Sequence, residues 1–221
     1  MIRVTLAPEP PDFDRCVRQP GLAALAEMVG ETSPNRPGPK RSKLAERRED
    51  IPADKLPPYW REAIPDLLRA YHRICAYTAL YIYPVTSAAS VDHSVAKSIQ
   101  WRHVYEWHNY RLACARVNSS KGVREALDPF EIEDEWFSLE LVGYQIVPGE
   151  GPQGPLRASI LATIEALKLN HVDFRDERAE YAEAYLGRDI SFAFLRSHAP
   201  FVAQELQRQG RLLADDAQQA R

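Results

Sequence analysis

One short polar segment, residues 91–122, constrains the fold of this chain more than any other part of its sequence. It contains Asp92 and His93 next to each other, then Asn109, then Asn118. Asn109 comes sixteen positions after His93 and Asn118 nine positions after Asn109, which leaves room for a strand, a loop and a short helix. Each residue alone could cap a strand or a turn, but separate caps would not explain the order of the set.

The side chains of this segment are those that metal-assisted hydrolysis of a phosphodiester requires. Asp92 and the side-chain carbonyl of Asn118 offer hard oxygen ligands to a divalent cation. A neutral imidazole at His93 can take a proton from an attacking water. Carboxylate and amide oxygens suit Mg²⁺ or Mn²⁺, whereas several imidazoles would favour zinc or nickel. The segment therefore predicts a reaction that depends on Mg²⁺ or Mn²⁺.

The same four residues, in this order, resemble the motif of the HNH endonuclease family in the variant that ends in Asn. The resemblance implies an α+β fold with a ββα-metal core. Asp92 and His93 would end its first strand, Asn109 would lie in the connecting loop, and Asn118 would project from the helix. In that family pattern Asp92 and Asn118 bind the catalytic ion. The implied catalytic set is His93 as general base, Asn109 holding the imidazole through nearby backbone, and Asn118. The activity that it implies is hydrolysis of DNA phosphodiester bonds.

The zinc knuckles that often accompany this motif are incomplete here. Each knuckle has the form Cys-x-x-Cys in the family, but this chain has Cys75 with Thr78 in one and Cys114 with Val117 in the other. Two thiolates do not close a tetrahedral zinc site, and His72 has no clear fourth partner. We therefore expect no structural zinc, with Cys75 and Cys114 packed as small buried apolar groups.

A basic, proline-rich stretch at residues 36–48 is the first candidate for contact with nucleic acid. It carries six basic residues and one acidic residue, in a chain whose net charge is −3. A solvated surface loop could have this composition, but phosphate binding rewards local positive charge, and the resemblance makes phosphate contact the preferred interpretation. The residues predicted to contact DNA are Lys40, Arg41, Lys97, Arg111 and Lys121.

Length and composition predict one domain, or one domain with a smaller attachment, because 221 residues with 45% hydrophobic content can bury a substantial core. We divide the chain into an extended N-terminal segment with a short helix and the basic linker (1–58), the HNH core (59–148) and a helical C-terminal region (149–221). Three cysteines argue against a disulfide framework. No apolar run has the length of a membrane span, and the first residues do not resemble a secretory signal, so we expect a cytoplasmic protein.

The expected elements follow from periodicity and from proline and glycine positions. Residues 1–20 should be extended because of their prolines, and Tyr105–Cys114 should lead into the metal helix, with Arg111 on it. The other expectations are a helix over 22–29, a helix over 59–71 broken at Pro65, a hairpin over 79–91, one bent or two strands over 136–147, helices over 156–169, 174–186 and 190–209, and a frayed end from 214.

Two alternatives remain open. His103 and His108 flank Trp107 and could replace His93 as base or add a ligand, although loop histidines beside aromatic residues are more often packed or solvated. The chain could also be a noncatalytic module for nucleic-acid binding or assembly on the same scaffold, which the intact motif argues against.

The likeness extends more loosely to nuclease subunits of bacterial anti-phage systems of the Septu type, which act with an ATPase. No phosphate-cradling glycine-rich loop occurs here, so an ATPase would be a separate chain. The acidic net charge would suit a subunit that a partner brings to DNA.

Overall fold

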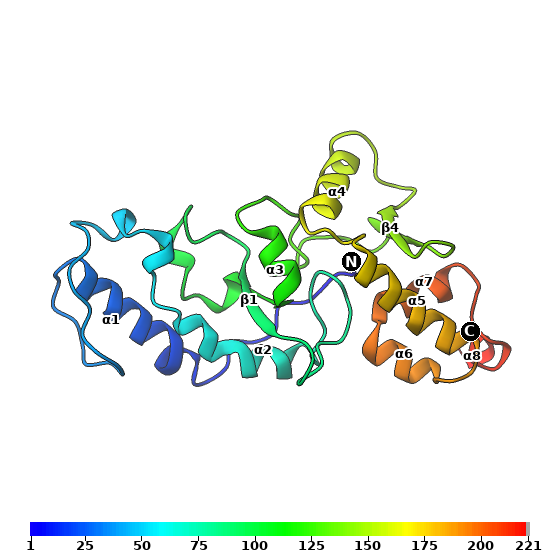
Figure 1. The fold of residues 1–221 in the computed structure, drawn as a ribbon, viewed down its shortest axis with the longest axis horizontal. Coiled ribbons are helices and arrows are strands. Elements are labelled where there is room, and N and C mark those ends of the chain that lie inside the picture. The colour runs from blue at the N-terminus through cyan, green and yellow to red at the C-terminus, as the bar shows by residue number, and fades with distance from the viewer. Residues whose placement is uncertain (220–221) are drawn as a thin grey trace. The chain divides into compact units, whose positions relative to one another are not determined.

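The computed structural model describes residues 1–219 and has the expected α+β class, with 44% of the residues in helices and two small two-stranded sheets (Figure 1). The helices are α1 (Gln19–Met28), α2 (Ile64–Ala70), α3 (Ala115–Lys121), α4 (Gly154–Ala166), α5 (Val172–Leu186), α6 (Phe192–His198), α7 (Pro200–Arg208) and α8 (Ala214–Gln219). The strands are β1 (Ala89–His93), β2 (Tyr110–Cys114), β3 (Phe137–Glu140) and β4 (Gln145–Pro148). None of the helices in the described range is both long and apolar enough to cross a membrane.

The chain forms two compact units, which are described separately below. The first, called the His93 unit, consists of Leu6–Ala70 and Ala89–Leu112. The second, called the C-terminal unit, consists of Met1–Thr5, Tyr71–Ala88 and the chain from Ala113 onward. These boundaries differ from the divisions that the sequence suggested at positions 58 and 148.

Residues 1–10 form no helix or strand, as expected for extended chain, but the extended chain predicted up to residue 20 is wrong beyond them, because a helix follows. A π-helical turn, Asp14–Arg18, runs directly into α1. Pro20 does not prevent this, because the helix changes from π to α geometry directly before it, where the missing N–H interrupts the hydrogen-bond ladder. Gly21 allows a close approach, since a Cβ at this position would lie 2.5 Å from the ring of Tyr105.

Two further predictions for this unit, the helix broken near Pro65 and the strand that ends at Asp92 and His93, agree with the structure. Residues Tyr59–Ala63 form a 3-10 turn and α2 follows from Ile64, so the break expected at Pro65 falls where the helix changes type. Asp92 and His93 end β1, which pairs with β2.

The expected hairpin over 79–91 is wrong. Outside the named strands, Ile74 and Tyr81 form an isolated bridge, and Pro84 lies in a turn. Pro84 has no N–H to donate to a strand ladder, and Ala79 has a positive φ of 53°. β1 therefore begins only at Ala89.

The C-terminal unit contains an antiparallel hairpin and a group of helices. β3 pairs with β4 in a register that places Leu139 opposite Ile146, in agreement with the two strands expected there. α5, α6 and α7 contact one another in this unit (Figure 1). The helix predicted over 190–209 is two helices, because Pro200 cannot continue α6 and instead begins α7.

The last described residues also differ from the prediction. Residues 214–219 form α8 rather than a frayed end, and the Tyr185 hydroxyl donates to Asp216 at 2.7 Å. Residues 220 and 221 lie outside the described range.

Candidate active site

His93 is buried at the end of β1, with 6% of its surface exposed. Its Nε2 lies 3.0 Å from the backbone carbonyl oxygen of Val104. A carbonyl oxygen can only accept a hydrogen bond, so this contact assigns the proton of the neutral imidazole to Nε2. In the neutral imidazole Nδ1 then carries no proton.

The carbonyl group of Val104 receives a second donor. The Tyr110 hydroxyl donates to the same oxygen at 2.8 Å, and the Tyr110 ring meets the His93 ring edge to face with centroids 5.2 Å apart. Burial raises the pKa of Tyr110, so this hydroxyl keeps its proton and remains a donor. Two donors occupy the two lone pairs of one carbonyl, which fixes the orientation of His93.

Asn109 fixes the loop that carries this carbonyl. Its side chain is 2% exposed and accepts from the backbone N–H of Val95 at 2.7 Å. Its amide nitrogen donates to the carbonyl oxygens of Val95 at 3.2 Å and His103 at 2.9 Å. Since His103 precedes Val104, Asn109 ties together the two ends of the loop that hold the imidazole.

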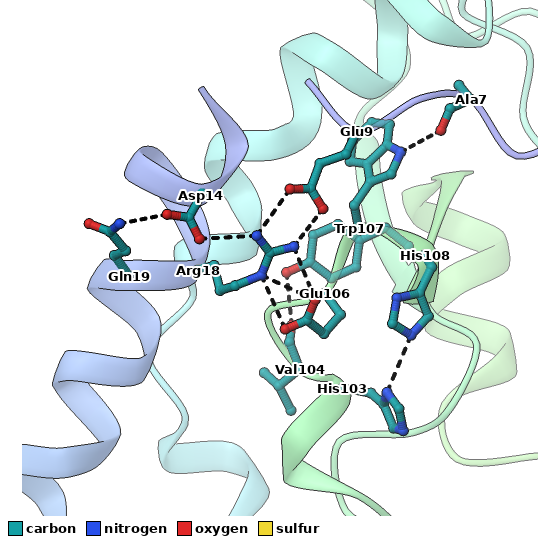
Figure 2. Close-up of polar contacts among 11 residues, drawn as sticks. Ala7, Glu9, Asp14, Arg18, Gln19, His103, Val104, Glu106, Trp107 and His108 are labelled. Atoms are coloured by element: carbon teal, nitrogen blue, oxygen red, sulfur yellow. Dashed lines mark hydrogen bonds and ion pairs between the residues drawn. The ribbon is translucent and has the colours of Figure 1, made fainter. Parts of the chain in front are cut away.

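A second set of contacts anchors the loop between β1 and β2 at its end nearest β2 (Figure 2). The Arg18 guanidinium lies between the carboxylates of Glu9, Asp14 and Glu106, and the bond with Glu106 reaches the loop at 3.1 Å. The Trp107 indole N–H donates to the carbonyl of Ala7 at 2.8 Å. The loop is thus held by charge-assisted and neutral hydrogen bonds to the N-terminal part of the His93 unit.

Trp60 and Lys97 complete the surroundings of His93. The Trp60 ring meets the imidazole edge to face with centroids 5.1 Å apart, and Lys97 Nζ lies 4.2 Å from the Trp60 ring centroid. Burial and the Arg61 guanidinium lower the pKa of Lys97, which Asp92 partly opposes. A phosphate at this position would favour the charged lysine. Lys97 was predicted as a DNA contact, whereas no sequence signal pointed to Trp60.

Asp92 is the candidate metal ligand in the His93 unit. It is 4% exposed and directly precedes His93 at the end of β1. Asn118 lies on α3 in the C-terminal unit, so its partnership with Asp92 remains a prediction from the resemblance. Within residues 1–219 no three His, Cys, Asp or Glu side chains form a group that could hold an ion. Mg²⁺ sites commonly combine one or two carboxylates with waters and substrate phosphates, so the oxygen of Asp92 fits this ion chemically.

Two residues predicted to contact phosphate are buried. Arg111 is 4% exposed and lies on β2 rather than on the expected helix, where its Nη1 donates to the carbonyls of His108 and Tyr110 at 2.7 and 3.0 Å. Lys121 is 6% exposed, with its Nζ 5.8 Å from the centroid of the Tyr77 ring. Both residues are buried to the same degree as Asp92 and His93, and their contacts with phosphate stay predictions.

Most cations of the basic stretch at residues 36–48 form ion pairs with acidic residues of this chain. Arg36 forms a buried ion pair with Glu27, and three other basic residues pair with acidic neighbours, in the pairs Lys43–Glu46, Arg47–Asp50 and Arg48–Glu31. Lys40 and Arg41 are exposed, and within the described chain their side chains make no ion pair. Of this stretch, these two cations therefore remain accessible to a phosphate.

The two incomplete knuckles meet in the C-terminal unit. Cys75 is 1% exposed, Cys114 is half-buried, and the Cys114 N–H donates to Cys75 Sγ at 3.4 Å. The two cysteines are therefore a polar pair rather than the apolar groups expected, while Val117 in the second knuckle is fully buried.

His103 and His108 lie apart from the contacts that hold the His93 ring. His108 Nε2 lies 3.3 Å from His103 Nδ1 (Figure 2), and His108 is exposed whereas His103 is half-buried. This placement favours the solvated alternative for both histidines.

Replacing Asn109 with alanine should destabilise the protein by about 2 kcal/mol, because one buried backbone N–H and two carbonyls lose their partner. Urea unfolding would measure this loss. Asn109→Asp offers a sharper comparison. Aspartate keeps an acceptor for the Val95 N–H, but its second oxygen replaces the amide donor and faces the carbonyls of Val95 and His103, so this variant should also be destabilised. Wild-type stability in both variants would contradict the proposed role of Asn109 in the loop.

Comparison with known proteins assigns no family, since neither a family model nor a curated protein matches this sequence. A functional proposal must therefore be built on the contacts around His93 and on the resemblance of the motif.

Proposed function

We propose that this chain is an endonuclease of the HNH type that uses Mg²⁺ or Mn²⁺ to hydrolyse DNA phosphodiester bonds. The observation that carries the proposal is the contact between His93 Nε2 and the Val104 carbonyl oxygen. It assigns the proton to Nε2 and leaves Nδ1 as the basic atom, which is the protonation state that a general base needs before catalysis.

The proposed reaction is a displacement at phosphorus. His93 Nδ1 takes a proton from water as the water oxygen bonds to phosphorus, and the bond from phosphorus to the leaving oxygen breaks. The Val104 carbonyl continues to accept from Nε2 and stabilises the imidazolium that forms. Within the His93 unit, Asp92 would hold the metal. When bound, the ion would supply Lewis-acid stabilisation of the phosphate oxygens.

The direct test is incubation of supercoiled plasmid with the purified chain and Mg²⁺ or Mn²⁺. We expect conversion to nicked circles, loss of that conversion with excess EDTA, and recovery when the metal is restored. A His93→Ala protein purified in the same way controls for contaminating nuclease. Absence of nicking with both ions, also in the presence of candidate partner proteins, would reject the proposal and favour the noncatalytic module.

DNA affinity should depend on Lys40 and Arg41 through phosphate contacts. The double variant Lys40→Ala/Arg41→Ala should bind DNA more weakly and should reduce the slope of log K against log salt by about 2. Fluorescence anisotropy over a salt series would measure both quantities. Lys43→Ala is the matched control, because Lys43 pairs with Glu46. An unchanged slope in the double variant would exclude these two contacts.

The proposal includes a protein partner, in keeping with a role as nuclease subunit in bacterial defence. The net charge of −3 disfavours tight unaided binding to DNA, because phosphate contacts need a basic surface. A partner, such as the ATPase that the wider resemblance implies, would bring the chain to DNA. Nicking should then rise when that partner is added.

A further inference from the structure

The pair Cys75 and Cys114 has a geometry that neither the nuclease proposal nor the missing zinc explains. The two residues are 39 positions apart in the sequence, yet the Cys114 N–H lies 3.4 Å from Cys75 Sγ. Cys75 follows the bridge residue Ile74, and Cys114 ends β2 directly before α3. Both belong to the C-terminal unit, so their proximity depends only on the packing of that unit.

Hydrogen bonds around Cys75 favour its thiolate. Burial alone would raise the pKa of Cys75, but donors from the Cys114 thiol, the Thr78 side chain and the backbone of both residues lower it to about 6. The pKa of Cys114 is raised, first by its hydrogen bond to Cys75 and then by burial. When the pair loses a proton, these shifts place the negative charge on Cys75. The thiolate is the form of cysteine that reacts with oxidants.

A cavity borders the pair at Cys114. It has a volume of about 360 Å³ and is lined by both residues whose side chains donate to Cys75, namely Thr78 and Cys114. Cys114 is half-buried, whereas Cys75 is 1% exposed and is not among the lining residues. From this cavity an oxidant as small as hydrogen peroxide would reach Cys75, whereas large thiols and disulfides would be excluded.

We propose that Cys75 and Cys114 are a peroxide-sensitive pair, in which Cys75 is the attacking thiol and Cys114 the resolving thiol of an intramolecular disulfide. The Cys75 thiolate attacks one oxygen of hydrogen peroxide, the O–O bond breaks, and sulfenic acid and hydroxide form. The Cys114 sulfur then attacks the sulfenic sulfur and displaces its oxygen as water, with the Cys114 proton. Overall, two thiols and one peroxide give one disulfide and two waters.

The disulfide would join the segment Tyr71–Ala88 to the start of α3. A cross-link between residues so far apart in the sequence restricts the unfolded chain, so the oxidised protein should melt about 5 °C higher than the reduced protein. The proposal does not depend on nuclease activity, and it requires no metal.

The test is peptide mapping by mass spectrometry under nonreducing conditions, on the full chain reduced beforehand and then treated with a small excess of hydrogen peroxide and a chelator. In the wild type we expect one linked peptide pair, Cys75 to Cys114, which dithiothreitol reverses. Cys16 is a built-in comparison, because it stands alone and half-buried. It should react about tenfold more slowly than Cys75.

Two variants separate the roles of the cysteines. Cys114→Ser should leave a sulfenic acid on Cys75 that dimedone traps, whereas Cys75→Ser should leave Cys114 reduced. The wild-type mapping stands even if a variant folds poorly. The proposal is overturned if no Cys75–Cys114 link forms in the wild type, if Cys16 oxidises as fast as Cys75, or if Cys114 is oxidised equally fast in folded Cys75→Ser.

Discussion

Replacing His93 with alanine should lower the rate of metal-dependent plasmid nicking by about 100- to 10,000-fold. The reason is that Nδ1 is the atom assigned to accept the proton of the attacking water, because Nε2 already donates to the Val104 carbonyl. Alanine also leaves a gap beside Trp60 and Tyr110. The nicking rate must therefore be measured at a temperature well below the melting point of the variant.

His93→Gln separates catalysis from packing. A glutamine amide nitrogen can replace Nε2 as donor to the Val104 carbonyl, but an amide offers no basic nitrogen. We expect a stability closer to wild type than that of His93→Ala and an equally low nicking rate. His108→Ala is the matched histidine control and should retain activity, because His108 is exposed and contacts His103 rather than His93. A near-normal rate in folded His93→Gln would rule out His93 as the base.

The sequence indicated which residues to examine around His93 but not how they are held. The motif order placed Asp92 and His93 at the end of β1 and Asn109 just before β2, as the structure has them. The partner of the imidazole is the backbone carbonyl of Val104, and every residue type has such a carbonyl. Trp60 is far from His93 in the sequence, so only the folded chain brings the two rings together.

The errors in the predicted elements have two physical causes. The first cause is that a proline has different effects at different positions of a helix. Pro20 lies in the first turn of α1 and the chain stays helical there, whereas Pro200 ends one helix and begins the next, so α6 and α7 are separate. The segment that contains Arg111 was read as the approach to a helix, yet Tyr110–Cys114 is a strand that is buried on both faces for most of its length. A short, largely apolar run has no periodicity that distinguishes a buried strand from a helix.

Replacing Glu205 with alanine should lower the free energy of unfolding of the C-terminal unit by about 3 kcal/mol. Glu205 is 1% exposed on α7, and its carboxylate accepts from the Leu139 N–H at 2.8 Å, the Ser138 hydroxyl at 2.9 Å and the Arg208 side chain at 2.7 Å. Alanine would leave a buried strand N–H without its acceptor and would remove the partner of the exposed Arg208.

Urea unfolding followed by hydrogen exchange of peptides from β3 and α7 would locate the loss in this unit. Glu165→Ala is the matched control, because Glu165 is exposed on α4 and its replacement should change stability by less than about 0.5 kcal/mol. Equal stability of the two variants would show that the Glu205 contacts contribute nothing.

Glu205 should also make the stability of this unit depend on pH. Burial alone would raise the pKa of its carboxyl group, but hydrogen bonds from Arg208, the Leu139 N–H and Ser138 lower it below the usual value of 4.5. The unfolded chain then binds more protons than the folded chain as pH falls, so the stabilisation is complete above about pH 5 and is lost in more acidic solution. Glu205→Gln keeps the shape but has no charge to titrate. Its unfolding free energy should therefore vary less between about pH 5 and pH 3 than that of the wild type. Parallel curves for the two proteins would mean that folding leaves the pKa of Glu205 unchanged.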